Sequence, residues 1–136
     1  MNINSVTFKA NYVTQWQVLV KPTNKNDKPE YVSASFVELD PENENDLDTM
    51  YNLNLHWGFL ETYAYQILDS MERIHKNLMR YNENSKFYAL TLQHDKFEKL
   101  EPKKILAVTE LTEDKDKNSI SINYLQVDPN NVRNAI

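Results

Sequence analysis

The sequence predicts an α+β fold, a mixed, mostly antiparallel sheet of about five strands with a helical hairpin or kinked long helix on one face. Segments rich in β-branched and aromatic residues lie on both sides of a central region with helical apolar spacing. The 136 residues, 40% of them hydrophobic, are enough for one substantial core. We therefore expect one domain over residues 1–136, with strands within 1–39, helices within 46–81 and strands within 86–128.

The first two strands are predicted on either side of a polar loop. Residues 14–21 are rich in β-forming side chains. Residues 31–39 alternate between apolar and polar side chains, which is the period of a strand with one buried face. Pro22 and Pro29 bound the polar segment between them, so we expect a hairpin with a long connection.

The central region changes from an acidic connector to helical spacing. Acidic residues occupy every second position from Glu38 to Asp48, and a helix is predicted from about Asp46 to Trp57. Gly58 is expected to break or kink this helix. An apolar stripe then follows one helix face through Leu60, Ala64, Ile67, Met71, Ile74, Leu78 and Tyr81. The stripe is typical of a helix packed on a sheet, and its heptad-like step leaves a homodimer open.

Three more strands are predicted after the helices, over residues 86–92, 104–112 and 119–127. A short helical turn is predicted within 94–103, and Pro102 is expected to end it. The charged residues 113–118 are expected to join the last two strands as a hairpin turn. One side of the final strand is expected to carry Ile120, Ile122 and Tyr124.

One glycine, Gly58, and the absence of cysteine exclude several enzyme classes. Phosphate-binding loops and the nucleophile elbow need glycines at fixed spacing. Disulfides, thiolate catalysis and cysteine-based zinc sites need cysteine. The formal net charge of −5 argues against general nucleic-acid binding, which depends on clustered Lys and Arg.

The composition also predicts where the protein works. The N-terminal residues show no basic segment followed by an apolar run, and no apolar stretch approaches the length of a membrane span. We therefore expect a cytoplasmic protein without membrane contact. Abundant Asn and an excess of Lys over Arg are typical of AT-rich genes, which indicates a low-GC bacterium or its mobile elements as the source.

The last two predicted strands resemble part of the GNAT acetyltransferase family. Residues 105–111 (ILAVTEL) are similar to the strand that precedes the family's central strand. Residues 120–129 (ISINYLQVDP) are similar to the central strand itself, with its L-x-V-x-P ending. The resemblance implies an acetyl-CoA-dependent N-acetyltransferase, or a truncated or degenerate relative of one. It also implies that the backbone of Leu125, Gln126 and Val127 lies along the pantetheine arm of acetyl-CoA. The family's next segment is a basic, glycine-rich turn, and residues 130–136 offer only Arg133 in that role.

Two residues of this region are candidates for catalysis. Glu110 is the candidate general base, which would take a proton from an amine substrate as it attacks the thioester. Tyr124 is the candidate general acid. The alternatives are that Glu110 is an exposed strand residue near a turn and that Tyr124 packs in the core.

A second function, a non-catalytic interaction module such as an inhibitor or adaptor of a mobile element, is also consistent with the sequence. The acidic side chains of Glu42, Glu44 and Asp46 are candidates for binding a protein partner, or are simply a solvated connector. Trp57 and Phe59, beside Gly58, are candidates for an aromatic partner site, or they anchor the helix junction to the core.

No metal site is predicted. Glu72 and His75 have the E-x-x-H spacing of half a di-iron site, but the sequence has no second pair of this kind. The acidic run from Glu38 to Asp48 lacks the glycine and the closing glutamate of an EF-hand loop.

Overall fold

The computed structural model describes residues 11–20, 28–77 and 85–130. Its elements in chain order are β1 (Asn11–Val20), β2 (Glu30–Leu39), α1 (Glu44–Trp57), α2 (Ala64–His75), β3 (Ser85–Thr91), the 3₁₀ helix η1 (Pro102–Lys104), β4 (Ile105–Asp114) and β5 (Ser119–Val127). The bounds of β5 are those that the sequence predicts.

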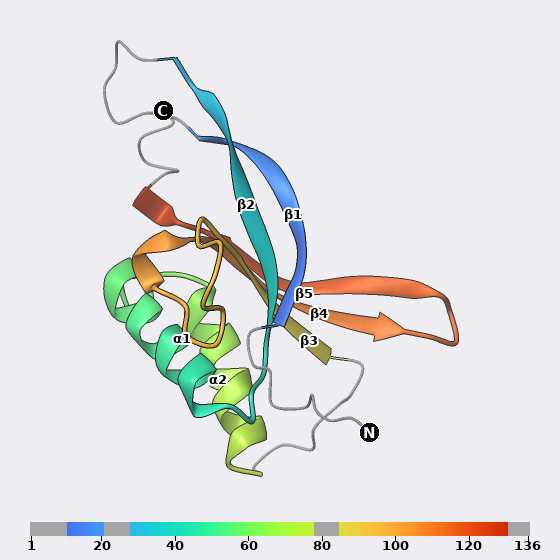
Figure 1. The fold of residues 1–136 in the computed structure, drawn as a ribbon. Coiled ribbons are helices and arrows are strands. Elements are labelled where there is room, and N and C mark those ends of the chain that lie inside the picture. Colours follow the sequence, from blue (N-terminus) through green and yellow to red (C-terminus); the bar gives the residue numbers. More distant parts are fainter. Residues whose placement is uncertain (1–10, 21–27, 78–84, 131–136) are drawn as a thin grey trace, which may run out of the picture.

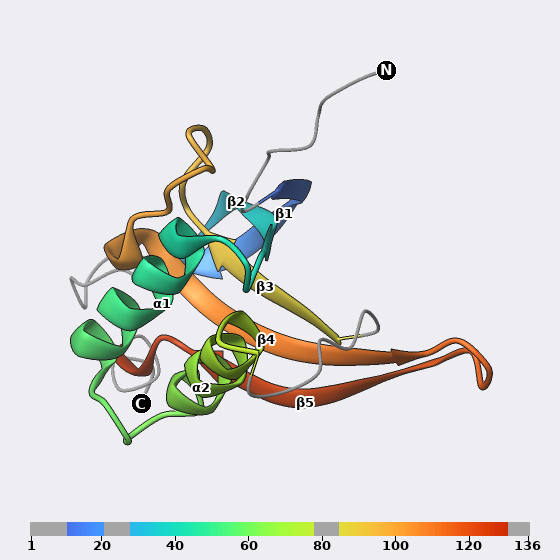
Figure 2. The ribbon, with the colours of Figure 1, turned by 90° about the horizontal axis from the view of Figure 1, so that it is seen from below.

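The five strands form one sheet in the order β1-β2-β3-β4-β5, so each strand lies beside its neighbours in sequence. All four pairings are antiparallel. Both helices cover the same face of this sheet (Figures 1 and 2). The α+β fold predicted from the sequence, a largely antiparallel sheet with a helical hairpin on one face, is confirmed.

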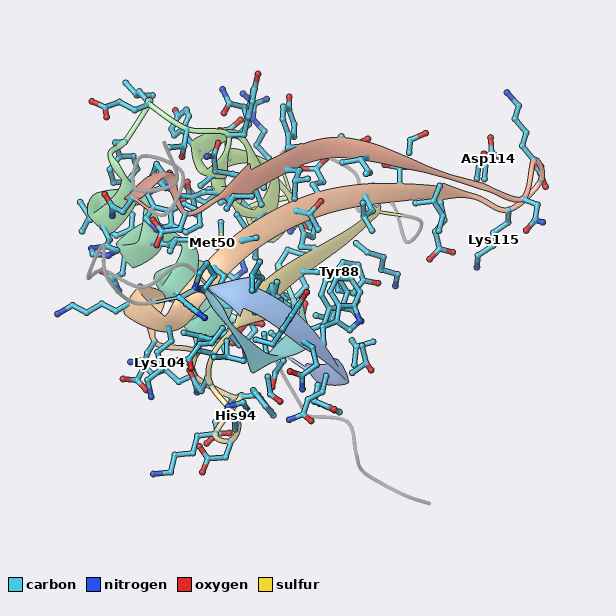
Figure 3. All side chains as sticks on the ribbon, turned by 90° about the horizontal axis from the view of Figure 1, so that it is seen from above. Met50, Tyr88, His94, Lys104, Asp114 and Lys115 are labelled. Carbon is cyan, nitrogen blue, oxygen red and sulfur yellow. The ribbon has the colours of Figure 1, made fainter. Side chains whose placement is uncertain are left out.

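The sheet has a short shared centre and two long hairpins. β2 and β3 pair only over Ser35–Leu39 and Phe87–Thr91. The β1–β2 and β4–β5 hairpins extend past this centre in different directions (Figure 1). Asp114 and Lys115 mark the tip of the β4–β5 hairpin, far from the helices (Figure 3). The hairpins therefore expose strand surface that the helices do not reach.

The start of α1 is held by a local hydrogen-bond network. The side chain of Asn43, the N-cap residue, accepts a hydrogen bond of 3.0 Å from the backbone N–H of Asp46. The carboxylate of Asp46 in turn accepts a bond of 2.8 Å from the backbone N–H of Asp40. Glu44 and Asp46 also place negative charge at the positive end of the helix dipole.

Gly58 ends α1, as the sequence predicts. Its φ of 97° lies in the left-handed region, and its backbone N–H donates to the carbonyl of Asn54 at 2.9 Å. The side-chain amide of Asn54 donates to the carbonyls of Met50 and Ala64, at 2.8 and 3.2 Å. Asn54 is fully buried, so this amide ties the end of α1 to the beginning of α2.

The predicted apolar stripe is confirmed over Ala64, Ile67, Met71 and Ile74, which are buried on α2. Leu60 differs, since it precedes the helix with a positive φ and is 75% exposed. Leu78 and Tyr81 lie outside the described residues. The stripe packs into a core formed by both helices and one face of the sheet, with Val37, Leu39, Met50, Leu53, Trp57, Phe87, Ala89, Leu100, Ile105 and Val108.

The prediction that Ile120, Ile122 and Tyr124 share one side of the last strand is wrong, because β5 contains a β-bulge. Glu110 pairs with Tyr124, but the next residue, Leu111, pairs with Ile122, so Asn123 is an extra residue in β5. The extra residue reverses the alternation. Tyr124 therefore packs against the core, whereas Ile122 points to the opposite face together with Ile120.

The segment between β3 and β4 is organised by a buried glutamine. The side-chain amide of Gln93 donates to three carbonyls of the loop, those of Asp95, Lys96 and Lys99, at 2.9–3.1 Å. Its oxygen accepts from the backbone N–H of Glu101 at 2.9 Å. Pro102 begins η1 instead of ending a helical turn, because its restricted φ suits the first position of a helix.

Replacing Gly58 by alanine should destabilise the protein by about 1–2 kcal/mol, because an L-residue is strained at positive φ. The new Cβ would also lie 2.7 Å from a carboxylate oxygen of Glu61. Urea unfolding measures this free energy. The control Asn52→Ala, on the exposed side of α1, should change stability by less than about 0.5 kcal/mol. Equal effects of both substitutions would contradict the role of Gly58.

Candidate functional site

The strongest surface feature is the face of the sheet turned away from the helices, which we call the open face. A shallow hollow of about 310 Å³ lies on it, and its lining is almost entirely apolar. The lining residues come from all five strands: Trp16, Phe36, Tyr88, Leu90, Ala107, Val108, Thr109, Leu111, Ile122 and Leu125.

Three aromatic rings stack across the open face. The centroids of Trp16 and Phe36 lie 4.9 Å apart with an interplanar angle of 13°. The centroids of Phe36 and Tyr88 lie 4.8 Å apart at 17°. The rings come from β1, β2 and β3, and Tyr88 is labelled in Figure 3. We call Trp16, Phe36 and Tyr88 the aromatic ladder.

The apolar surface continues beyond the hollow. Trp16 and Ile122, which line the hollow, are 51% and 64% exposed. Outside the hollow, Ile120 and Val127 are exposed large apolar residues of β5. Soluble monomers rarely leave a contiguous apolar surface of this extent without a function. The open face therefore has the character of a contact surface.

Charged residues occur at one end of the open face. Strand alternation puts Glu38 on the face of Phe36 and Lys86 on the face of Tyr88, and the two charges form an ion pair of 3.7 Å. Burial raises the pKa of the Tyr88 phenol, and the negative charges of Glu38 and Glu113 raise it further. The phenol is therefore kept in its neutral form.

The other candidate region lies where β5 meets the connection between the helices. A hollow of about 270 Å³ there is lined by Leu60, Glu61, Thr62, Tyr63, Gln66 and Gln126. The backbone N–H of Tyr63 donates to the side-chain oxygen of Gln126 at 3.0 Å. The rings of Tyr63 and Tyr124 lie 5.9 Å apart. The structure thus brings two residues predicted from the sequence, Tyr124 and Gln126, to one place.

Glu110 is buried beside this region, with an exposed fraction of 9%. One carboxylate oxygen accepts a hydrogen bond of 2.9 Å from the amide of Asn123, which also donates to Thr112 at 2.8 Å. The other carboxylate oxygen is buried without a hydrogen-bond partner among the described residues. Glu110 is thus no exposed strand residue, but it does not line either hollow.

Leu125, Gln126 and Val127 lie on the outer strand of the sheet. Within the described part of the chain, β5 pairs only with β4. The N–H of Asp128 donates inward to Leu106 at 2.8 Å, so alternation turns the N–H groups of Leu125 and Val127 outward. The carbonyl of Val127 accepts a hydrogen bond of 2.8 Å from the side chain of Gln126. Among the described residues no strand pairs with the outward N–H groups, which the predicted contact with a pantetheine arm would use.

Some of the residues predicted to bind a partner are exposed, and others are buried. Glu42 and Glu44 are exposed at the start of α1, but Asp46 is fully buried and accepts a hydrogen bond there. Trp57 is 3% exposed and belongs to the core. The two buried side chains are therefore corrected from surface to structural residues.

Phe59 is half-buried at the helix junction. It packs against the core and meets the rings of Tyr51 and Tyr65 edge-on, at 5.3 and 6.3 Å. These contacts agree with the alternative given by the sequence, in which the aromatic residues near Gly58 anchor the helices.

Comparison with models of known protein families, with curated proteins and with solved structures found no match for this chain. The resemblance to GNAT acetyltransferases therefore stays a prediction. Among the described residues, no helix has the length and apolar character needed to span a membrane. The same residues contain no cluster of His, Asp and Glu that could hold a metal ion.

Tyr88→Phe should change the alkaline stability profile while it keeps the stacked ring. The raised pKa of Tyr88 contributes to the free energy of unfolding. This contribution is fully present below the ordinary pKa of 10.0 and is lost as pH rises through the pKa of the folded state. The unfolding free energy of the wild type should therefore fall relative to that of Tyr88→Phe between about pH 9 and pH 11. Urea unfolding across this range measures the difference, and parallel profiles would contradict it.

Proposed function

We propose that this chain is a protein-interaction module that binds a protein partner through the open face of its sheet. The observation that carries the proposal is an apolar face, built by five strands, which neither helix covers. The aromatic ladder gives this face large rings at its centre. Aromatic residues are enriched in protein interfaces and supply much of their binding energy.

The chemistry of the open face favours a protein over a small ligand or a nucleic acid. Small-molecule sites carry convergent polar groups that orient the ligand. Here the hydroxyl of Thr109 is already bonded to the carbonyl of Tyr124 at 2.8 Å. Nucleic-acid surfaces combine aromatic rings with free cations. The cation beside this ladder, Lys86, is paired with Glu38, and the chain carries a net charge of −5.

Site-specific photo-crosslinking in the cells of origin tests the proposal. The substitution Trp16→p-benzoylphenylalanine keeps an aromatic ring on the open face and adds a photoreactive ketone. Irradiation should produce a covalent adduct of higher mass at this position. The matched control places the same group at Leu55, which is 58% exposed on α1. Adducts at neither position, or equally at both, would overturn the proposal.

A second candidate function, acetyl-CoA-dependent N-acetyl transfer, is favoured by the open edge of β5. The outward backbone groups of Leu125 and Val127 would hold the pantetheine arm. The order from β2 to β5 is strand, two helices and three strands, which is the order the GNAT resemblance implies. Acetyl-CoA would supply the thioester. The amine nitrogen would bond to the acetyl carbon as the carbon–sulfur bond breaks. Glu110, which is buried, would take the amine proton through a water molecule, and Tyr124 would protonate the departing sulfur.

Calorimetric titration of the chain with acetyl-CoA and with CoA tests this second function. Val127→Pro removes an outward N–H while it leaves the inward bonds to β4 intact, so it should weaken binding at least about tenfold. Val127→Ala, which keeps the N–H, is the matched control and should bind like the wild type. No heat at millimolar cofactor would remove this candidate.

A further inference from the structure

We propose that the partner of the open face is a second copy of this chain, packed sheet on sheet about a two-fold axis. This inference rests on the proposed function, because it names the occupant of the same surface. Three properties of the described residues support a second copy: the width of the face, its area and the placement of charge.

The width of the open face suits a sheet better than a single helix. Five strands spaced about 4.8 Å apart span about 19 Å. One helix with its side chains is about 10 Å wide and would leave half of the face in water. A second copy presents a face of equal width because it is the same chain. Sheets pack face to face at about 10 Å, with the side chains of both inner faces interlocked.

The area of the face reaches the size that a specific dimer needs when both hairpins take part in the contact. All five strands lie abreast only at the shared centre, where β2 and β3 pair over five residues. At about 3.3 Å per residue and a width of about 19 Å, this centre measures about 310 Å² in projection. Two such centres bury about 630 Å² before side-chain relief is counted, and a specific interface needs about 1,000 Å². The longer β1–β2 and β4–β5 hairpins extend the contact, with Ile120 exposed near the tip of the second.

The placement of charge permits self-association at this face. The strand β5 reads SISINYLQV and has no charged residue. At the end of the face Glu38 and Lys86 neutralise one another, and Glu113 adds one negative charge near Tyr88. Elsewhere the chain is acidic, with exposed Glu42 and Glu44 at the start of α1. Two identical acidic surfaces repel, whereas two faces that are apolar over most of their area associate through the hydrophobic effect.

A two-fold interface doubles the effect of any substitution, because each residue contributes once from each copy. Trp16→Lys would put two cations into the apolar contact and should weaken dimerisation at least about 100-fold. Leu55→Lys on α1 introduces the same charge at a comparably exposed apolar residue outside the face. It should leave dimerisation unchanged.

Sedimentation equilibrium of the purified 136-residue chain at micromolar concentrations tests the inference. The wild type and Leu55→Lys should show twice the chain mass of 16.1 kDa, and Trp16→Lys should show the mass of one chain. Urea unfolding verifies that Trp16→Lys is folded, and Ile122→Lys on β5 replaces it if it is not. A monomeric wild type, or equal dimerisation of all variants, would overturn the second copy as the occupant.

The mass of the photo-crosslinked adduct separates this inference from the proposed function. An adduct at position 16 of about two chain masses supports both. An adduct of another mass, together with a monomeric purified chain, overturns the second copy and leaves the interaction function standing. A monomeric chain without an adduct at position 16 overturns both.

Discussion

The packing of both helices on one face of an antiparallel sheet is the constraint on which the rest of the structure depends. Alternate residues of a strand point to opposite faces, so helices on one face leave every second strand residue uncovered by a helix. Val37, Phe87 and Val108 are buried against the helices. Phe36 and Tyr88, their neighbours in sequence, stack on the other face. The exposure of this surface therefore follows from the one-sided helix layer, whereas its apolar character comes from the side chains that the sequence places on it.

Buried polar side chains hold that layer in position. The amide of Asn54 joins the end of α1 to the first residue of α2. The carboxylate of Asp46 binds the backbone that leads from β2 into α1. Gln93 organises the loop that carries Leu100 into the core. Each of these groups exchanges hydrogen bonds to water for hydrogen bonds to the backbone. A buried polar group that is left without a hydrogen bond costs about 1–3 kcal/mol.

The two candidate functions use different parts of the sheet. Partner binding uses the side chains of the open face, whereas acetyl-CoA binding would use the backbone along the outer edge of β5. Sheets that pack face to face leave their edges at the rim of the interface. A second copy on the open face is thus compatible with a cofactor along β5. The hollow between Tyr63 and Gln126 lies beside β5 on the side of the helices.

The sequence by itself determined the fold class, the end of α1 at Gly58, the apolar stripe of α2 from Ala64 to Ile74 and the bounds of β5. It could do so because glycine conformation and apolar periodicity are local properties.

Only the tertiary structure decided which side chains reach the surface. Trp57 is an aromatic beside a glycine in the sequence, but it is buried because its side of α1 meets the sheet. The aromatic ladder joins residues of three strands that are distant along the chain, and it depends on strand register. Register and bulges, such as the one at Asn123, are set by packing across the whole sheet, so no local pattern reveals them.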